Sequence, residues 1–322
     1  MRTRARLAAL LACLLAASAA WAEQYPSRPI HWVVPYTPGG ITDSVTRIVA
    51  NKLEAALGQP IVIENKPGAN SIVGVESVAR SAPDGYTALT VIAAHAANAT
   101  LYTGKLPFDP VKSFAPVSLV GVAPLILTVA NDFPARDVKE LIEYARANPG
   151  KVSFGSSGVG AAAHLTTELF AQTANIQMVH VPYKGTAPAL AGLLAGDIQV
   201  LVDVPSSMMP HVRAGKIRAL GLFASRRSPG AAEVPTLVEA GGPPVEGSTW
   251  VLFLAPAGTP REIVARLSAE TAKVLAMPEI RARFEQLGVE PGGGTPAEAA
   301  RFLDAEIEKW ARVITTAKVR PE

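Results

Sequence analysis

The segment VPYTPGGITDS, residues 34–44, joins two different repeating patterns. Before it, Ile30–Val34 is a short apolar run rich in β-branched residues, which predicts a buried strand. After it, apolar side chains recur at helical spacing from Val45 to Leu57, which predicts an amphipathic helix. A strand that ends in Pro-Gly-Gly and turns directly into a helix leaves backbone N–H groups unpaired at the turn. The segment therefore predicts a βα unit whose loop can hold an anion.

The same order of strand, loop and helix recurs along the chain. Two similar blocks, at about residues 30–120 and 125–220, contain βα units with glycine or other small residues where the strands end. This alternation predicts an α/β fold with parallel sheets. Parallel sheets bind ligands beyond the carboxyl ends of their strands. Two such sheets facing each other predict a cleft between hinged domains.

The loops that follow the predicted strands are the candidates for lining this cleft. Besides the opening segment, we expect such loops at Glu64–Ser71, Ala93–Asn98, Gly155–Gly160, Pro182–Thr186 and Asp203–Ser207. The tail from Arg261 to Lys309 is expected to be helical, with a break at glycines 292–294.

The N-terminus predicts a secreted protein. Three arginines within residues 1–6 precede the apolar run Leu7–Ala20, and Ala20-Trp21-Ala22 follows as an A-x-A cleavage site. The apolar run is too short to span a membrane. We therefore interpret residues 1–22 as a signal peptide that directs the chain to the periplasm. A lipoprotein signal around Cys13 is the weaker alternative.

Removal of this leader changes both the charge and the chemistry that the chain can perform. The leader takes three of the 30 basic residues and no acidic one, so 27 basic residues face 27 acidic ones. A neutral mature chain gives no reason to expect nucleic-acid binding. Cys13 is the only cysteine. The mature protein therefore has no disulfide, no thiolate nucleophile and no cysteine metal ligand.

The glycines of the opening segment are the first candidate binding residues. Gly39 and Gly40 allow a close approach of the backbone to a ligand, and the helix that follows offers free N–H groups. A carboxylate or a phosphate suits such a loop. Thr42 or Asp43 could instead cap the helix, which is a purely structural role.

The Gly155–Gly160 loop has three interpretations. Gly158-Val159-Gly160 with Ala163 fits the dinucleotide pattern G-x-G-x-x-A, but the next strand does not end in the acidic residue that this pattern requires. A secreted serine hydrolase would use Ser156 or Ser157 with His164 and Asp203, although the spacing departs from a nucleophile elbow. The simplest interpretation is an anion cradle made of hydroxyl and amide groups, which His164 could brace.

Other polar residues follow predicted strands. Tyr183 and Lys184 could reach the cleft, and Asp203 would select a ligand that carries an amine or a hydroxyl group. The five histidines are scattered and do not pair with carboxylates at metal-ligand spacing, so no metal site is predicted. Candidates for specificity deeper in the cleft are His95, Asn98, Asp203 and Trp250.

Together these motifs make the sequence similar to a known family. It resembles the extracytoplasmic substrate-binding receptors of the tripartite tricarboxylate transporter system, called Bug receptors. The resemblance rests on segments in family order over the mature chain: VPYTPGG (34–40) with Asp43, VIENKPGA (62–69), APDGYT (82–87), GSSGVG (155–160) with His164, VPYKG (181–185), VPT (234–236) and APAGTP (255–260).

The resemblance implies a periplasmic-binding-protein-like fold of type II, a Venus flytrap with two parallel-sheet domains and a hinge. Residues 23–123 and 224–322 would form domain 1, and residues 124–223 domain 2. Backbone amides and waters at Tyr36–Asp43, which includes Thr37, and at Gly155–Gly160 would hold one carboxyl group of the ligand. Asn70 and Ser71 depart from the family, which commonly has glycines there.

The function expected from this resemblance is that of a periplasmic solute-binding receptor and not of an enzyme. It would capture a small carboxylate, namely a di- or tricarboxylate, an amino acid or an aromatic acid. It would act as a monomer without a cofactor and deliver the ligand to the membrane components of a tripartite tricarboxylate-type transporter. The alternatives are the serine hydrolase described above and a ligand-sensing subunit of a signalling system.

Overall fold

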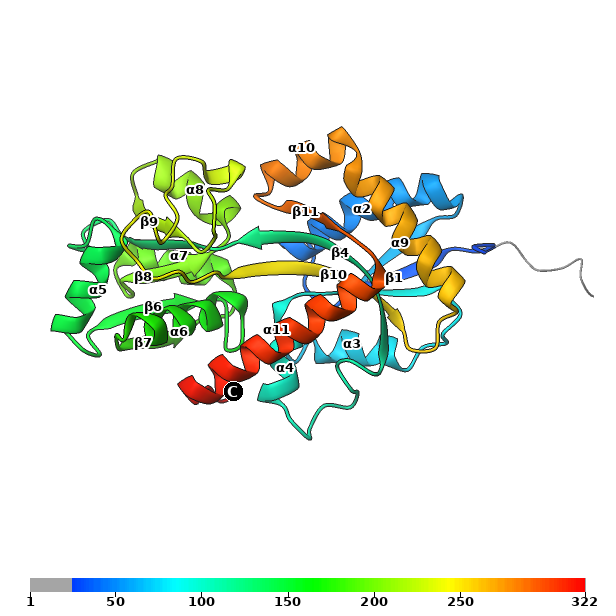
Figure 1. Ribbon diagram of the computed structural model, residues 1–322, viewed down its shortest axis with the longest axis horizontal. Coiled ribbons are helices and arrows are strands. Elements are labelled where there is room, and N and C mark those ends of the chain that lie inside the picture. Colours follow the sequence, from blue (N-terminus) through cyan, green and yellow to red (C-terminus); the bar gives the residue numbers. More distant parts are fainter. Residues whose placement is uncertain (1–24, 322) are drawn as a thin grey trace, which may run out of the picture.

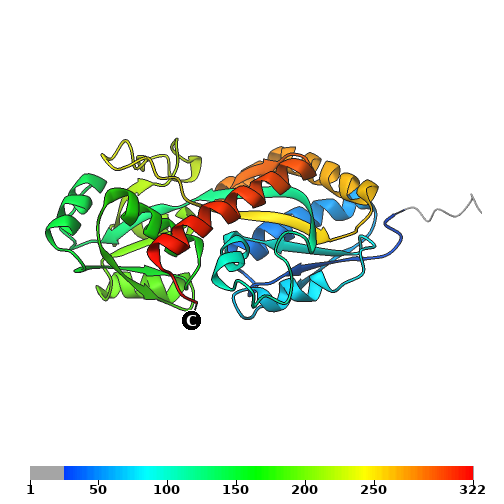
Figure 2. The ribbon, with the colours of Figure 1, turned by 60° about the horizontal axis from the view of Figure 1, so that its bottom comes forward.

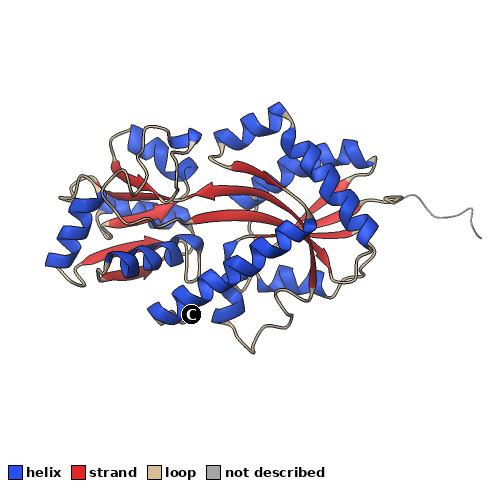
Figure 3. Ribbon diagram, in the orientation of Figure 1, coloured by secondary structure: helices blue, strands red, loops and turns tan. Residues whose placement is uncertain are grey.

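The computed structural model describes residues 25–321 and contains two α/β lobes of unequal size. The lobes lie side by side and two long strands run between them (Figure 1). Helices cover the sheet of each lobe (Figure 3). The predicted signal peptide lies outside the described residues. None of the described helices has the length and hydropathy needed to cross a membrane.

The larger lobe is built on a six-stranded sheet. Parallel pairing joins β1 to β2 and to β3, as the βα pattern predicts. The strands of this sheet, in spatial order, are β11 (Glu290–Gly293), β4 (Phe114–Pro124), β10 (Ser248–Pro256), β3 (Thr87–Val91), β1 (Ile30–Val34) and β2 (Ile61–Asn65).

Six helices belong to this part of the described chain, and they include one that the sequence analysis missed. Residues 93–98, expected to be a loop, begin a helix. Five of the nine residues in AAHAANATL are alanine, which has the highest helix propensity. The six helices are α2 (Ile41–Leu57), α3 (Ile72–Ala79), α4 (Ala93–Leu101), α9 (Arg261–Ala276), α10 (Pro278–Gln286) and α11 (Pro296–Ala317).

The smaller lobe contains a five-stranded sheet with the order β7-β6-β8-β5-β9. Its strands are β5 (Ile126–Ala130), β6 (Val152–Ser156), β7 (Met178–Pro182), β8 (Val200–Asp203) and β9 (Ile217–Leu222). Its helices are α5 (Val138–Ala147), α6 (Ala162–Ala174), α7 (Thr186–Ala195) and α8 (Pro205–Arg213). The short 3₁₀ helix η1 (Pro229–Ala231) lies in the connection from β9 to β10 and contacts both α8 and α10.

Both sheets are mixed, which corrects the expectation of parallel sheets. The strands β1, β2 and β3 are parallel to one another, and so are β6, β7 and β8. By contrast, β10 is antiparallel to both β3 and β4, and β5 is antiparallel to both β8 and β9. The strands β5 and β10 each follow a crossing between the lobes, so their direction is set by the crossings and not by the βα repeat. Strand β11, in the tail, is also antiparallel to β4.

The chain crosses between the lobes at two places, and the crossing segments are hydrogen bonded to each other. Leu125 separates β4 from β5, and residues 223–247 connect β9 to β10. The Leu125 N–H donates to Gly247 O at 3.0 Å, and the Phe223 N–H donates to Leu125 O at 2.9 Å. Figure 2 shows β4 and β10 running together through the narrow middle of the molecule. A hinge motion of one lobe relative to the other would bend the chain at these residues.

The C-terminal helix α11 connects the lobes a third time. It packs on β4 and α4 in the larger lobe and reaches α6 in the smaller one (Figures 1 and 2). Near its C-terminal end, Gln172 Nε2 of α6 donates to Val313 O at 3.3 Å. The glycine segment expected to break the helical tail does separate α10 from α11, and part of it belongs to strand β11, which pairs with β4.

Candidate functional site

A cavity of about 730 Å³ lies between the lobes and is lined by residues from both of them. The carboxyl ends of β1 and β3 face it from one side, and those of β6 and β8 face it from the other. Its polar lining consists mainly of hydroxyl groups and glycine backbone. From the larger lobe come Tyr36, Thr37, Gly39, Gly40, Thr42, Ser44 and Thr249, and from the smaller lobe Ser157, Lys184, Gly185, Thr186, Asp203, Ser206 and Ser207.

Five helices begin at this cavity. Their N-cap residues, which all line it, are Gly40 of α2, Ile92 of α4, Ala161 of α6, Gly185 of α7 and Val204 of α8.

None of these five N-cap residues provides a side-chain cap. N–H groups in the first turn therefore lack intrahelical acceptors and remain available to a ligand. There are fewer of them in α8, because Pro205 has no N–H and the Ser207 N–H donates to Val204 O. Helices α5 and α11 begin elsewhere, and Asp137 and Thr295 cap them. Helices α9 and α10 are also uncapped, although they begin away from the cavity. The lack of a cap therefore does not mark the site by itself, and the significant feature is that five N-termini meet at one cavity. It creates a positive potential without a cluster of cationic side chains.

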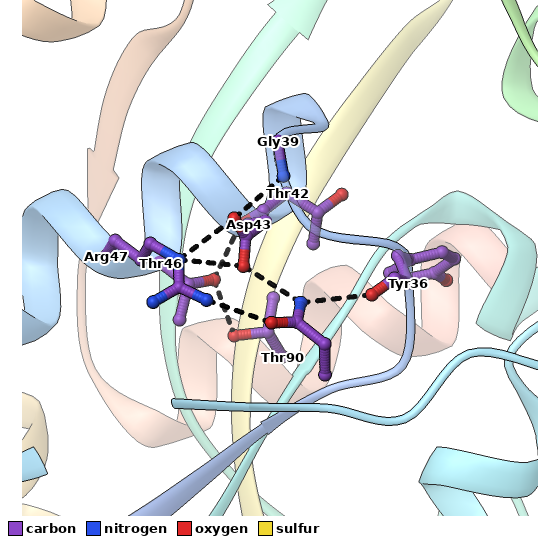
Figure 4. Close-up of polar contacts among 8 residues, drawn as sticks. Tyr36, Gly39, Thr42, Asp43, Thr46, Arg47 and Thr90 are labelled. Atoms are coloured by element: carbon purple, nitrogen blue, oxygen red, sulfur yellow. Dashed lines mark hydrogen bonds and ion pairs between the residues drawn. The ribbon is translucent and has the colours of Figure 1, made fainter. Parts of the chain in front are cut away.

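The first loop is held in shape by Asp43 (Figure 4). The buried carboxylate of Asp43 accepts from the N–H of Gly39 at 2.9 Å and from Asn65 Nδ2 at 2.9 Å. Arg47 Nε donates to both carboxylate oxygens, at 3.0 and 2.9 Å. Asp43 does not line the cavity, so it supports the loop from behind.

The same contacts explain why Asp43 remains charged. Burial by itself raises the pKa of the Asp43 carboxyl group, but hydrogen bonds from Arg47, Gly39 and Asn65 outweigh this and lower the pKa below its ordinary value. A charged Asp43 accepts the Gly39 N–H more strongly than a neutral one would. The loop geometry is therefore fixed over the whole range of neutral pH.

Tyr36 contributes a phenol ring to the cavity wall. Its hydroxyl oxygen is buried and has no hydrogen-bond partner among the described residues, and the same is true of Ser71 Oγ. The two hydroxyl groups are neighbours, outside hydrogen-bonding geometry. Burial raises the pKa of Tyr36, so the phenol is neutral. Two unpaired buried hydroxyl groups at the edge of a cavity are suited to hold a water or a polar ligand atom.

The second loop, Gly155–Gly160, is braced by two histidines. Ser156 Oγ lies 2.7 Å from Nε2 of His180, which comes from the neighbouring strand β7. The Gly160 N–H donates to Nδ1 of His164 at 3.1 Å. His164 therefore braces the loop, as one interpretation of the sequence suggested. The contribution of His180 was not predicted, because it depends on the pairing of β6 with β7.

The catalytic triad of the hydrolase alternative is not assembled. Ser156 pairs with His180 and not with His164. Asp203 accepts hydrogen bonds from Thr186 Oγ1 at 2.7 Å and from the Val204 N–H at 2.7 Å, and not from a histidine. Ser156 is also completely buried, whereas a nucleophile must be reached by its substrate.

Asp203 and Lys184 are the acidic and basic side chains of the cavity lining. Lys184 is exposed, and Asp203 is buried where α7 and α8 begin. Burial raises the pKa of the Asp203 carboxyl group, although the hydrogen bonds from Thr186 and Val204 oppose this. Each carboxylate oxygen of Asp203 already accepts one hydrogen bond from the protein, and a donor on the ligand would favour the charged form of this buried group.

Two residues expected deeper in the cleft, His95 and Asn98, lie on α4, but their side chains do not line the cavity. The His95 ring is buried, with Nε2 2.9 Å from Pro110 O and Phe108 stacked on it. Burial lowers the pKa of His95 to about 4. Asn98 holds the loop that follows β2: its Nδ2 donates to Asn70 O at 2.8 Å and its Oδ1 accepts from Asn70 Nδ2 at 2.8 Å. Both side chains point elsewhere because residues 93–101 form a helix.

Tyr183 and Trp250 are also placed by packing. Cβ atoms added at Gly155 of β6 and at Gly192 of α7 would both meet the Tyr183 side chain, so this ring fills space between β6 and α7. Trp250 is 1% exposed, and its Nε1 donates to Glu306 of α11 at 2.7 Å. Neither side chain lines the cavity. Gly158, whose φ of 139° is difficult for other residues, shapes the second loop from beside the cavity.

Five hydroxyl groups that line the cavity were not among the predicted site residues: Ser44, Thr186, Ser206, Ser207 and Thr249. Thr186, Ser206 and Ser207 do lie in the predicted loops 182–186 and 203–207. Thr186, Ser206 and Ser207 stand at or near the start of a helix that follows a strand. That position was the available signal. Among residues 25–321 there is no group of three or more His, Cys, Asp or Glu residues arranged to hold a metal ion.

Comparison with known proteins gives consistent results. The family model described as "Tripartite tricarboxylate transporter family receptor" matches residues 45–319. Protein BugT of Bordetella pertussis is 35% identical over 306 residues, which is 93% of this chain and 93% of BugT.

Two solved structures extend the likeness to the fold. "R. palustris Rpa4515 with adipate" has a TM-score of 0.83 and 36% identity, and the match covers 92% of this chain and 100% of that one. "MatC (Rpa3494) from Rhodopseudomonas palustris with bound malate" has a TM-score of 0.78 and 32% identity, covering 90% and 100%. These likenesses confirm the predicted two-domain fold of a periplasmic binding protein. The chain thus belongs to the family of tripartite tricarboxylate transporter receptors, which includes the Bug proteins.

Proposed function

We propose that this protein is a periplasmic receptor that binds a small organic acid in the cavity between its lobes. It then delivers the acid to the membrane components of a tripartite tricarboxylate-type transporter. The ligand is a di- or tricarboxylate, an amino acid or an aromatic acid, and the receptor acts as a monomer. We assign residues 23–123 and 224–322 to one domain and residues 124–223 to the other.

The observation that carries this proposal is the convergence of five uncapped helix N-termini from both lobes on one cavity. An anionic group held there receives N–H donors from the two lobes at once. Binding would therefore favour the closed arrangement, since only closure brings both sets of donors to the same ligand. The crossing at Leu125, Phe223 and Gly247 provides a hinge. The names of two similar structures include adipate and malate, which supports a carboxylate as the ligand.

Titration calorimetry with the mature protein tests the ligand class. The panel contains succinate, malate, adipate, citrate, aspartate and benzoate, with a neutral sugar as the control. We expect at least one carboxylate to bind and the sugar to give no heat. Binding of the sugar with no response to any acid would refute the proposal.

Asp203 is proposed to select the part of the ligand that lies away from the anionic group held by the helix N-termini. A buried carboxylate in the wall of an otherwise anion-binding cavity favours a hydroxyl or ammonium donor and repels a second carboxylate. Removing its charge should therefore change which acid binds and not whether acids bind.

The Asp203→Asn variant is expected to reduce the preference for malate or aspartate over succinate by about tenfold, the value of one charged hydrogen bond. Calorimetric Kd values for these acids measure the ratio. Asp197→Asn, an exposed change just before the same strand, is the control. An unchanged ratio in the Asp203 variant would show that Asp203 only ties α7 to α8.

A further inference from the structure

The Ser156, His164 and His180 cluster lies directly behind the second loop and has no assigned role. The imidazole rings of His164 and His180 are stacked, with centroids 3.7 Å apart and planes 9° apart. Phe154 of β6 stacks on His180 at 4.9 Å. His164 and Ser156 are 3% and 0% exposed. None of the three side chains lines the cavity, but each histidine is hydrogen bonded to the loop that lines it.

The hydrogen bonds of Ser156 indicate which ring nitrogen of His180 carries a proton. Ser156 Oγ donates its only hydrogen to Gly158 O at 3.0 Å and accepts the Gly158 N–H at 3.2 Å. We assign the 2.7 Å contact with His180 as a hydrogen bond from Nε2–H to Ser156 Oγ, because this assignment satisfies all three contacts of the hydroxyl group at once. Ser156 thus receives two hydrogen bonds and gives one, and all three hold the turn around Gly158.

The state of His164 follows in the same way. The Gly160 N–H points at Nδ1 of His164, so Nδ1 carries no proton and the neutral ring is protonated at Nε2. A second proton on Nδ1 would place two donors face to face and break this bond. It would also add a positive charge against His180. Glu168 Oε1 of the same helix lies 3.7 Å from His164 Nε2 and is the charged group that faces the pair.

The loop that these rings hold touches both the cavity and the other lobe. Ser157 and Ala161 to Ala163 line the cavity, and the amides of the first turn of α6 are free donors. A Cβ atom added at Gly160 would lie 2.5 Å from Leu101 Cδ1 of α4 in the larger lobe. A shift of the loop would therefore displace both the anion donors and the contact that forms between the lobes.

We propose that His164 and His180 are positioning residues that must both be neutral for the second loop to hold its ligand, so that carboxylate affinity falls at acidic pH. This inference rests on the proposed function. The rings act through Ser156 and Gly160 and not by contact with the ligand. The part of the ligand held by this loop is the anionic group common to all candidate acids. A fault in the brace should therefore weaken all of them by a similar factor.

The sign of the pH effect follows from the titration of His180. Burial, and then the neighbouring His164, lower the pKa of His180 from 6.5 to about 3. Because the pKa of His180 is lowered in the braced loop, its titration does not change the stability of that loop above pH 6.5. Below pH 6.5 it disfavours the braced loop increasingly, until about pH 3. Affinity should thus be constant above pH 7 and decrease as the pH falls from 6.5 towards 5.

The first test compares two substitutions of one side chain. His180→Phe keeps a ring in the stack but removes the Nε2–H donor, whereas His180→Gln keeps a donor at a similar reach. We expect His180→Phe to raise the Kd of every carboxylate that binds by about tenfold, and His180→Gln to restore most of the affinity. His31→Gln, on the exposed side of β1, is the control. Equal affinities for His180→Phe and the wild-type protein, or a failure of His180→Gln to restore binding, would overturn the proposal.

The second test is the pH profile. We compare the Kd values of the wild-type protein and of the double variant His164→Asn/His180→Gln at pH 7.5 and pH 5.5. Over this range the wild-type Kd should rise about tenfold more than that of the variant. The reason is that the braced loop suppresses the protonation of an imidazole whose ordinary pKa is about 6.5. The double variant corrects for protonation of the ligand itself, and Asn at 164 keeps an acceptor for the Gly160 N–H. Parallel profiles would refute the pH switch.

A ligand-free measurement separates this inference from the proposed function. Long-range ¹⁵N–¹H correlation spectra of the wild-type protein at pH 7 should show both rings neutral and protonated at Nε2. A charged ring, or a proton on Nδ1 of His164, would overturn the proposal even if carboxylates bind. If the wild-type protein binds no acid in the panel, the proposed function fails while this spectrum still decides the state of the brace.

Discussion

Gly39→Val is expected to weaken carboxylate binding about 100-fold, because the strain of 1–3 kcal/mol at a left-handed backbone would be relieved by moving the loop. Gly39 has φ = 84°, a conformation that β-branched residues almost never adopt. Its N–H is the group that Asp43 holds. When φ changes, this hydrogen bond breaks and the uncapped start of α2 no longer faces the cavity as it does now.

A control is available at the other end of the same helix. Gly58, the C-cap of α2, has φ = 73°, and neither glycine has an atom within 4 Å of an added Cβ. Gly58→Val therefore imposes a similar strain far from the cavity. Both variants should lose similar stability in thermal unfolding, but only Gly39→Val should lose binding in calorimetry. If Gly39→Val binds acids like Gly58→Val, the first loop is not part of the cradle.

The two glycines of the opening segment are not equivalent. Gly40 has φ = −71°, which any residue adopts, and a Cβ atom there would meet only Thr37 O at 3.8 Å. The sequence placed the two glycines together, but the backbone requires glycine only at the first. The second matters because it lines the cavity and lets a ligand approach the helix start.

Glu306→Ala is expected to lower the free energy of unfolding by about 3 kcal/mol, since it leaves two buried indole N–H groups without an acceptor. Glu306 Oε2 accepts from Trp250 Nε1 at 2.7 Å and from Trp310 Nε1 at 2.9 Å. Both indole rings are almost completely buried, at 1% and 0% exposure. The carboxylate therefore ties α11 to β10, the strand that runs between the lobes.

Urea unfolding followed by tryptophan fluorescence measures this loss as a lower midpoint. Glu306→Gln keeps an acceptor oxygen and should lose much less stability. Glu308→Ala, on the same helix with its side chain 72% exposed, removes only a surface ion pair with Arg312 and should change stability by less than about 1 kcal/mol. A midpoint for Glu306→Ala equal to that for Glu308→Ala would contradict the role assigned to Glu306.

Local sequence patterns predicted much of the fold. The βα units of residues 30–91 and 152–203 follow from apolar periodicity and from glycines at the strand ends, which are properties of short segments. The segment at 93–98 was misjudged because a polar loop and an alanine-rich helix begin with similar residues. The break at glycines 292–294 was predicted correctly, but the pairing of Gly293 with β4 was not, since it depends on a strand far away in sequence.

The candidate site divides in the same way. The sequence indicated Gly39, Gly40 and the Gly155–Gly160 loop, because each follows a strand and precedes a helix. It misplaced Trp250 and His95, whose side chains turn into the packing of α11 and α4. It also did not pair Ser156 with His180, which lies 24 residues further along the chain and reaches Ser156 only through the β6–β7 register.

The sequence by itself therefore determined the order of the βα units and the loops with free N–H groups, since both depend on residues close together in the chain. The tertiary structure alone decided that five helix starts share one cavity, that α11 spans both lobes and that two histidines stack behind the second loop. These features depend on long-range strand pairing and helix packing, which bring together residues from distant parts of the chain and which no local periodicity encodes.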